Sequence, residues 1–599
     1  MGRDGPAAPP WWRRPVVVGA GLHALVTAPL VVALVAFHRP EWHPLTDLAQ
    51  TEMRVRDVGT ADSPLVGLAG RIGPWTDPGS HPGPLSFWAM APVHRLLGGT
   101  ALAFSAAGLV LHLVAFALVL RIAHRRGGIP LMAGVAAACA LLVRAYGAVV
   151  FLEPWNPFLP VVWWLAFVLA AWSVVEDGSH LVVAVVAGSF CAQTHLPYLG
   201  TVGVGIGALI AVCGYRIVTG SPEERRRRIV ALATAGLVGL VLWLPPLIDQ
   251  VADTHNLGRI RGSLQHPTEP AAGLVDGARE VVDRFGFDYW LSASDGAEVA
   301  ASSTRTPGGI LVLGLWLAAA VACWSGRVGP PSLRRFHAVL AAGVVLAFVS
   351  SSRISGERWF YLYFSVMGLA VLCLLATGWT VAAVVAERTR RPGVRRAAVV
   401  APVALAALLS LSAAVAAPSV EPADRGRAEA LGILADDTAA ALRRADGGTG
   451  RYLVRWEDPV GIGAQGMGLV NELERAGLTV GIEEGHRVAG TAHRVMAPGE
   501  ATAVVVLAVG PAIDGWEDQG ARRVALVDPR TAAERDEQEA RTARLDATFR
   551  AAGDDAAVER WWRNLFVAPL DPDLPPAARA EVMAYLDLPA PAAVFLLPT

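Results

Sequence analysis

Long apolar segments alternate with short polar ones along the first 417 residues of the chain. A helix needs about 20 apolar residues to cross a bilayer, and about eleven segments come close to that length. The expected spans are residues 16–37, 101–123, 129–150, 158–175, 180–199, 200–218, 229–248, 308–325, 336–352, 360–386 and 397–417. The pattern therefore predicts a polytopic α-helical membrane protein over residues 1–417.

The pattern changes abruptly after residue 417, where Pro418 and Pro422 mark a linker and charged residues become frequent. Helical and extended patterns then alternate. Helices are expected at 423–445, 464–476 and 530–552, and strands at 451–456, 478–482 and 503–509. This alternation predicts a small α/β domain over residues 418–599.

The composition of the whole chain supports a membrane protein. Of its 599 residues, 53% are hydrophobic and 17% are charged, whereas a soluble chain carries about 25% charge. The same figures exclude a disordered chain, and the 5 cysteines exclude a disulfide scaffold. All the cysteines lie inside apolar segments without metal-ligand spacing, which indicates buried hydrophobic side chains.

The net charge of −1 hides an asymmetry between the two parts of the chain and gives no reason to expect a nucleic-acid partner. Residues 1–417 carry a net charge of +9, and residues 418–599 a net charge of −10. Arginines cluster at 13–14, 125–126, 225–228, 334–335 and 388–396. With eleven spans all of these clusters fall on one side, which the positive-inside rule makes the cytoplasm.

The expected topology is a multi-pass protein of the plasma (inner) membrane, with its N-terminus inside. The first helix is too long for the core of a signal peptide and is expected to be an uncleaved anchor. Three segments then lie outside: the loops 38–100 and 249–307, and the domain 418–599.

The first outer loop holds two candidate segments. Residues 46–59, TDLAQTEMRVRDVG, place Asp47 and Glu52 close to the first span. Residues 80–99 begin with HPGPLSFW, a Pro-rich and aromatic stretch too short to span, which is typical of an interfacial segment. His81 opens it, as a ligand or as a structural hydrogen-bonding group.

Further candidates lie at the outer ends of other spans. Glu153 and Asn156 lie between prolines in FLEPWNPF, where a carboxylate is costly unless it faces water, a partner or a ligand. Arg144 is close enough in sequence to pair with Glu153 as a purely structural contact. His195 ends the fifth span, and Arg358 lies beside aromatic residues, as a clamp for a lipid phosphate or as an ordinary headgroup contact.

These candidates share one face of the membrane, because the expected topology places all of them outside. A transporter would instead be expected to hold its ionisable residues near the bilayer midplane. Jointly, they favour a site on the outer face.

A glycine-rich segment, GIGAQG at 461–466, matches a dinucleotide-binding pattern, with Glu483 and Glu484 about twenty residues further on. Its expected location outside the cell, where nicotinamide cofactors are scarce, argues against that function. The strand before it, RYLVRW, is also rich in charge. A glycine-rich turn in a small α/β domain is favoured.

The layout of residues 16 to about 380 resembles the GT-C superfamily of membrane glycosyltransferases. The segment TDLAQTEMRVRDV is similar to the acidic motif of their first outer loop, and HPGPLSFW to the Pro-rich aromatic segment that follows it. The nearest groups in pattern are aminoarabinose transferases, protein mannosyltransferases and actinobacterial arabinofuranosyl and mannosyl transferases. The domain at 418–599 is similar to the extracytoplasmic domains of the larger actinobacterial members, which are thought to help bind glycan.

The resemblance implies an inverting transfer of a sugar from a polyprenyl-phosphate donor to an envelope acceptor that is a glycan, lipid or protein. Asp47 would be the catalytic base, and an arginine, Arg358 or Arg144, would stabilise the leaving phosphate. The residues expected to bind substrate or donor are Glu52, His81, Glu153, Asn156, His195, Arg144 and Arg358.

Relatives often carry an acid where this chain has His81, which leaves the metal requirement open, with a divalent ion between His81 and Glu153 as one alternative. The expected partners are the lipid-linked donor, membrane lipid and the acceptor. Two other functions stay open: a transporter or flippase of lipid-linked sugar, and a non-catalytic scaffold for envelope assembly.

Overall fold

The computed structural model describes residues 14–39, 41–74, 77–286, 306–326, 328–389, 393–422, 424–461 and 463–598. Arg13, Arg390 and Arg391 of the arginine clusters, residues 287–305 of the second outer loop, and Ile462 of the glycine-rich turn lie outside these ranges.

The chain divides into two compact units. One comprises Met1–Phe37 and Ser63–Glu421, and is called the membrane unit below. The other comprises His38–Asp62 and Pro422–Thr599, and is called the C-terminal unit. The sequence predicts a division at 417/418 with residues 38–62 in the membrane domain, whereas this division groups them with the C-terminal residues.

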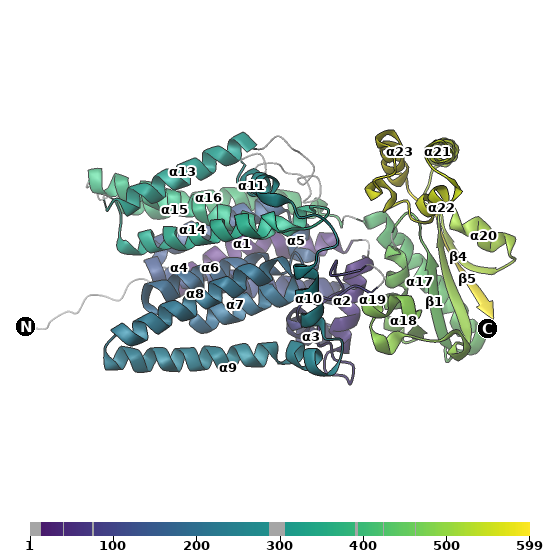
Figure 1. Cartoon of the computed structure of the whole chain (residues 1–599), viewed down its shortest axis with the longest axis horizontal. Helices are drawn as coiled ribbons and strands as arrows, with labels where there is room; N and C mark the ends of the chain where they lie inside the picture. The colour runs from purple at the N-terminus through teal and green to yellow at the C-terminus, as the bar shows by residue number, and fades with distance from the viewer. Residues whose placement is uncertain are drawn as a thin grey trace, which may run out of the picture. The chain divides into compact units, whose positions relative to one another are not determined.

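The membrane unit is helical (Figure 1). Its helices are α1 (Pro15–Phe37), α3 (Leu85–Leu96), α4 (Ala101–Tyr146), α5 (Val149–Leu152), α6 (Pro160–Asp177), α7 (Leu181–Thr194), α8 (Pro197–Thr219), α9 (Pro222–Ala252), α10 (Asn256–Gln265), α11 (Gly273–Asp283), α13 (Thr306–Trp324), α14 (Pro331–Ser352), η3 (Phe360–Tyr363), α15 (Phe364–Thr389), α16 (Gly393–Ala416) and η4 (Ala417–Ser419).

Nine helices within the described ranges are long and apolar enough to cross a membrane. The predicted spans 101–123 and 129–150 both lie in α4, where Gly127 and Gly128 leave helical geometry, with φ of −145° and 64°. The predicted span 180–199 contains α7, an apolar helix of only 14 residues. Each predicted segment thus falls on a helix, which confirms the polytopic helical fold class.

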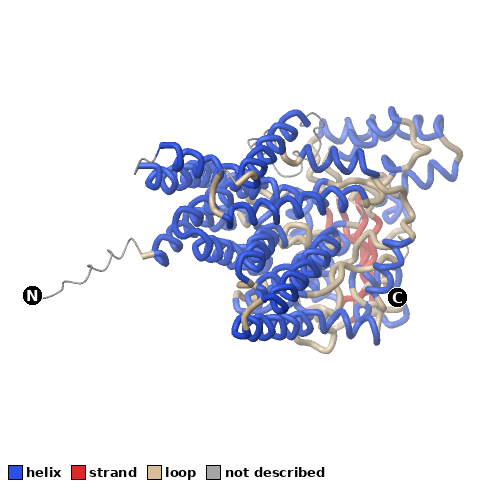
Figure 2. Tube along the Cα trace, turned by 60° about the vertical axis from the view of Figure 1, so that its left-hand side comes forward, coloured by secondary structure: helices blue, strands red, loops and turns tan. Residues whose placement is uncertain are grey.

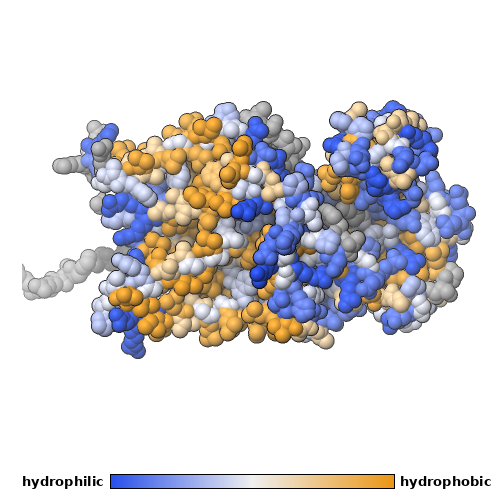
Figure 3. Space-filling model, viewed as in Figure 1, coloured by the Kyte–Doolittle hydropathy of each residue, from blue (hydrophilic) through white to orange (hydrophobic). Residues whose placement is uncertain are grey.

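Hydrophobic side chains cover much of the surface of the membrane unit in Figure 3. On α9 they include Leu237, Val241 and Leu244, which are exposed to solvent in the isolated chain. A helix with an apolar outer face is stable when lipid covers that face. The C-terminal unit, in contrast, is mostly hydrophilic on the face that Figure 3 shows.

The C-terminal unit contains all five strands of one sheet, drawn in red in Figure 2. Its elements are α2 (Thr46–Asp57), α17 (Arg425–Asp446), β1 (Arg451–Glu457), α18 (Ala464–Arg475), β2 (Thr479–Gly481), η5 (Glu484–His486), α19 (Arg487–Gly490), η6 (Ala492–Arg494), η7 (Pro498–Glu500), β3 (Ala503–Val509), α20 (Ala512–Asp518), β4 (Arg522–Val527), α21 (Ala532–Ala552), α22 (Asp555–Arg563), η8 (Ala568–Leu570), α23 (Pro576–Leu586) and β5 (Ala592–Pro598).

The strand order is β2-β1-β3-β5-β4. Strands β1, β2 and β3 are parallel, as expected for strands joined by helices, and β5 runs antiparallel between β3 and β4. Leu453, Val506 and Phe595 form part of the buried core on this sheet. The predicted small α/β domain is confirmed, although β4 and β5 were not predicted.

Candidate functional site

The loop that carries His81 is fixed by a buried hydrogen-bond network in the membrane unit. The side chain of Asn256, at the start of α10, accepts from the backbone N–H of Ser80 at 2.8 Å and donates to its carbonyl at 2.9 Å. The backbone N–H of Asn256 donates in turn to the Asp249 carboxylate at 2.9 Å. Asp249 is fully buried near the end of α9. The loop therefore has a defined position despite its lack of regular structure.

His81 is buried within this loop. Its Nδ1 accepts a hydrogen bond from the backbone N–H of Leu196 at 3.0 Å, which assigns the ring proton of the neutral form to Nε2. A Cβ at Gly70 would lie 3.2 Å from that Nε2, so only glycine leaves the ring unobstructed there. Burial lowers the pKa of His81 to about 4, which keeps the ring neutral at physiological pH.

Four rings link three of the predicted segments. The His81 ring centroid lies 5.3 Å from that of His195, and His195 lies 6.1 Å from Tyr361. Tyr361 lies 4.9 Å from Trp155 with its ring nearly perpendicular. We call these four residues the ring row. The structure thus brings together the Pro-rich segment, the end of α7 and the FLEPWNPF turn.

The FLEPWNPF turn carries Glu153 and Asn156 beside Trp155. Glu153 follows α5, and the backbone N–H of Trp155 donates to its carbonyl at 2.7 Å, which closes the turn tightly. Asn156 is buried. A Cβ at Gly108 of α4 would lie 2.9 Å from Pro154, so this glycine permits the close approach of the turn to α4. The acid and the amide are therefore held on a rigid turn.

The two predicted arginines have structural partners within the membrane unit. Arg144, in the last turn of α4, donates from Nε to the hydroxyl of Ser412 at 3.2 Å. Arg358 donates to Asp276 of α11 at 2.7 Å, and its Nε lies 3.9 Å from Glu280. The hydrogen bond to Asp276 raises the pKa of Arg358. Two nearby carboxylates therefore offset the positive charge of Arg358.

Asp47 and Glu52 belong to the C-terminal unit. Asp47 is in the first turn of α2, where a carboxylate interacts favourably with the helix dipole. Glu52 is fully buried, and its carboxylate contacts Arg475 and accepts from the Asn471 amide at 2.9 Å. The predicted site residues are thus divided: these two in one unit, and His81, Glu153, Asn156, His195, Arg144 and Arg358 in the other.

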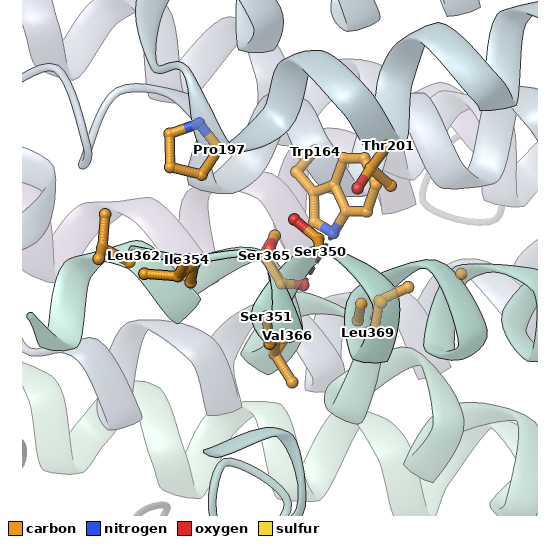
Figure 4. Close-up of a pocket in the computed structure, with 12 residues that line it drawn as sticks. Trp164, Pro197, Thr201, Ser350, Ser351, Ile354, Leu362, Ser365, Val366 and Leu369 are labelled. Carbon is orange, nitrogen blue, oxygen red and sulfur yellow. Dashed lines mark hydrogen bonds between the residues drawn. The ribbon is translucent and has the colours of Figure 1, made fainter. Parts of the chain in front are cut away.

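A small pocket lies between α6, α8, α14 and α15 (Figure 4). Its lining residues are Trp164, Pro197, Thr201, Gly343, Ala347, Ser350, Ser351, Ile354, Leu362, Ser365, Val366 and Leu369. The Trp164 indole donates to the carbonyl of Ser365 at 2.9 Å, the dashed contact in Figure 4. Pro197 and Leu362 follow His195 and Tyr361 closely in the chain, so one end of the pocket lies near the ring row.

The donor set around His81 does not suit a metal ion. Its Nδ1 is occupied by the Leu196 N–H, which leaves one nitrogen for any ligand. Over the part of the chain that the structure describes, no group of three or more His, Cys, Asp or Glu is placed to hold an ion. A divalent ion usually takes three or more protein donors.

The glycine-rich turn at 461–466 packs against an aromatic side chain. A Cβ at Gly463 would lie 2.4 Å from the Trp456 indole nitrogen, and a Cβ at Gly466 would lie 2.4 Å from its ring carbons. The ring of Trp456 also lies 4.1 Å from that of His486. The indole thus occupies the space that the two glycines leave, as a structural turn requires.

Asp249 and Asn256 were not predicted from the sequence. The available signal was a carboxylate close to the end of an apolar helix, where an ionisable residue needs a partner. The partners of Asp249 are the hydroxyl and backbone N–H of Thr254 and the backbone N–H of Asn256, which a hydrophobicity pattern does not indicate.

Comparison with known proteins identifies relatives by structure alone. No protein-family model and no curated protein matches the sequence. ArnT from Cupriavidus metallidurans bound to undecaprenyl phosphate matches with 14% identity and a TM-score of 0.50, over 84% of this chain and 96% of that chain. The apo state of the same ArnT matches with 14% identity and a TM-score of 0.49, over 84% and 96%.

An oligosaccharyltransferase from Archaeoglobus fulgidus in complex with Zn and sulfate matches with 10% identity and a TM-score of 0.41, over 80% of this chain and 67% of that chain. ArnT is an aminoarabinose transferase of the GT-C superfamily. At 14% identity, the structural match to ArnT establishes the fold and not the activity. The chain therefore has the GT-C fold, as the resemblance of its sequence predicted.

Proposed function

We propose that this protein is an inverting glycosyltransferase that moves a sugar from a polyprenyl-phosphate donor to an acceptor in the cell envelope. One observation carries the proposal: the fold matches nearly the full length of an ArnT structure bound to undecaprenyl phosphate. A fold alone does not fix chemistry. The resemblance of the 46–59 and 80–99 segments to GT-C motifs adds the chemical argument.

The proposed topology has the N-terminus in the cytoplasm and the C-terminal unit outside the plasma membrane. Its support is the distribution of arginine. The cluster at 125–126 lies just before the kink of α4, and those at 225–228 and 334–335 lie in the first two turns of α9 and α14. All three positions share one side of the membrane under this topology. Donor, acceptor and membrane lipid would then meet on the outer face.

The proposed reaction is a single displacement at the anomeric carbon. The acceptor hydroxyl oxygen forms a bond to that carbon, Asp47 takes the hydroxyl proton, and the bond to the phosphate oxygen breaks. Polyprenyl phosphate leaves with the electron pair of the broken bond. Because its negative charge grows in the transition state, a cation near the phosphate would lower the barrier.

We assign donor binding to His81, His195, Glu153 and Asn156 of the membrane unit. The neutral His81 can donate from Nε2, and Glu153 and Asn156 offer acceptors and a donor to sugar hydroxyls. Arg144 and Arg358 are the proposed phosphate contacts, Arg358 only if it exchanges one of its carboxylate partners for the phosphate. Because the donor set at His81 does not suit a metal ion, no step is assigned to one.

The small pocket between α6, α8, α14 and α15 is a proposed contact for the isoprenoid chain. Its lining combines apolar side chains such as Trp164 and Leu369 with the hydroxyls of Thr201, Ser350, Ser351 and Ser365. An apolar tail would gain free energy where it covers the apolar side chains. Its closeness to the ring row would keep the tail near the residues assigned to the sugar phosphate.

The proposal is tested by transfer assays on purified full-length protein in detergent, with a panel of polyprenyl-phosphate pentoses and hexoses. Asp47→Asn keeps the shape of the side chain and removes the base, so we expect the rate to fall by about 10²- to 10⁴-fold. The matched control is Asp437→Asn, an exposed acid on α17 of the same unit, which should retain the wild-type rate.

Other outcomes identify other functions. A flippase would not consume the donor in detergent, where two compartments do not exist, but would move it across reconstituted vesicles. A scaffold would show neither activity, and alanine at Asp47, Glu153 and Arg358 would leave envelope assembly unchanged. Full activity of Asp47→Asn would refute the assignment of the base.

A further inference from the structure

The acidic segment of the first outer loop is built into the C-terminal unit at three places along its length. The first is the entry to α2, residues 43–45. A Cβ at Gly432 of α17 would lie 2.4 Å from the His43 ring, and a Cβ at Gly468 of α18 would lie 3.0 Å from the Pro44 carbonyl. Two helices therefore approach the chain just before Asp47 as closely as glycine allows.

The second place is the middle of α2, where charged side chains meet one face of α18. Gly468, Asn471, Glu472 and Arg475 recur at the spacing of a single helix face. Arg475 contacts the buried Glu52 and also donates to Glu472 at 2.7 Å. Asn471 accepts from Arg56 of α2 at 2.8 Å and donates to Glu52 at 2.9 Å. The polar side chains on this face of α18 thus have hydrogen-bond or ion-pair partners.

The third place is the end of α2. Arg494 donates from both terminal nitrogens to the two oxygens of Asp57, each at 2.8 Å, and from Nε and Nη2 to Glu474 at 2.9 and 2.8 Å. The side chain of Arg494 is only 3% exposed. Arg54 of α2 donates to the carbonyls of Val488 and Ala489, each at 2.7 Å.

Such contacts define a position more strictly than apolar packing does. A bidentate arginine–carboxylate pair fixes both distance and orientation, and a buried charge without its partner is strongly unfavourable. Burial opposes ionisation of Asp57, but hydrogen bonds from His493 and Arg494 outweigh it and hold the pKa of Asp57 below its usual value. Any shift of α2 along α18 would break several of these bonds together.

We propose that Arg475 and Arg494 are positioning residues for Asp47, which act by holding α2 in a single position within the C-terminal unit. The C-terminal unit would then contribute to the chemical step itself, in addition to any binding of glycan. This inference rests on the proposed function for the role of Asp47, and on the contacts within the C-terminal unit for the position of α2. It also gives Glu52 a structural role, whereas the sequence predicted that Glu52 contacts the donor.

The test uses full-length protein with Arg494→Met and Arg475→Met, which keep much of the side-chain volume and remove the charge. The matched control is Arg451→Met, whose ion pair with Glu500 is more than half exposed and contributes little. Two measurements are made on each variant: hydrogen exchange of the peptide that covers α2, and kcat and KM for the lipid-linked donor.

We expect faster exchange in α2 for both variants and a kcat that falls by about 10²-fold, since a misplacement near 1 Å has that effect. The KM for the donor should stay close to the wild-type value. Arg494→Lys, which keeps the charge but loses the bidentate geometry, should recover part of the rate. A purely structural role would lower the amount of folded protein without a change in kcat per folded molecule.

Gly468→Ala gives an independent test from the other end of α2, because its Cβ would press on Pro44 and Leu431. It should also lower kcat, with the charges intact. Unchanged α2 exchange in Arg494→Met, or faster exchange with a wild-type kcat, would overturn the inference. If the wild type transfers no sugar while Arg494→Met still loosens α2, the proposed function fails and the holding of α2 stands.

Discussion

The contact between Gly466 and Trp456 makes a quantitative prediction about the glycine-rich turn. Gly466 lies in the first turn of α18, and a Cβ there would fall 2.4 Å from the Cγ and Cδ2 atoms of the indole. Those atoms are close to the backbone of Trp456, so the ring cannot move aside without displacing β1. Overpacking of this kind costs about 1–3 kcal/mol.

Gly466→Ala should therefore destabilise the C-terminal unit by that amount. A free-energy change of about 1–3 kcal/mol corresponds to an increase of about 5- to 150-fold in the opening equilibrium. Hydrogen exchange of peptides from β1 and α18 in the full-length protein measures this directly. The slowest-exchanging amides should show the full increase.

The same substitution should have the opposite effect when the indole is absent. In a Trp456→Ala background the added methyl group meets no ring, and alanine is a better helix former than glycine by up to about 1 kcal/mol. A double-mutant cycle isolates this change of sign. Equal destabilisation by Gly466→Ala in both backgrounds would refute the packing argument. Binding of NADH to the wild type, weakened by Gly466→Ala, would support the dinucleotide alternative.

Three further predictions follow from other parts of the molecule. Ala347→Trp should fill the small pocket and raise the KM for long-chain donors by about tenfold. The KM for short-chain donors should stay unchanged. Val349→Trp, on the exposed face of the same helix, is the control in the same transfer assay. Asn256→Ala should remove the two side-chain hydrogen bonds to the backbone of Ser80, while the backbone N–H at position 256 can still donate to Asp249. The loop around Ser80 should lose about 1–3 kcal/mol of stability, which limited proteolysis of that loop would detect. Arg494 holds the pKa of Glu474 low against the effect of burial. The ionised Glu474 therefore contributes stability above its unfolded pKa of about 4.3, and this contribution is lost as pH falls through the lower folded pKa. Thermal unfolding of the C-terminal unit in acid should show this loss, and Arg494→Met should abolish it.

The sequence predicted the membrane helices well because lipid imposes a local requirement. An apolar stretch such as 229–248 predicts a membrane helix from its own composition and length, and it lies within α9. The same is true of β3, whose predicted range of 503–509 matches its observed range. β4 and β5 were not predicted, because RRVALV has charged residues where the strand begins and AAVFLLP directly follows a proline-rich stretch.

The candidate site was predicted less completely, because its contacts join residues that are distant in sequence. Glu52 meets Arg475 across more than four hundred residues, and no periodicity in the first outer loop indicates this pair. The sequence singled out His81, but the partner of its Nδ1 is a backbone N–H, which carries no sequence signal. Arg358 likewise pairs with Asp276 of α11, which is 82 residues away in sequence.

The C-terminal unit is assembled from two pieces of chain that residues 63–421 separate in sequence, and this separation has a consequence for biogenesis. About 360 residues separate Asp62 from Pro422. At about 5–20 residues per second, a ribosome takes roughly 20–70 s to add them. Throughout that interval α2 lacks the helices that later bind it, and under the proposed topology it has by then been translocated.

We expect the charged residues of α2 to be solvated during this interval, which would limit aggregation of the segment. Because its buried charges pair with Asn471 of α18 and with residues 488–494, we expect α2 to become ordered only after those segments are synthesised. Under the proposed function, a nascent or truncated chain would hold its spans in the membrane yet lack a placed base. The protein would then become catalytically competent only late in synthesis, so that an incomplete chain would not consume the lipid-linked donor.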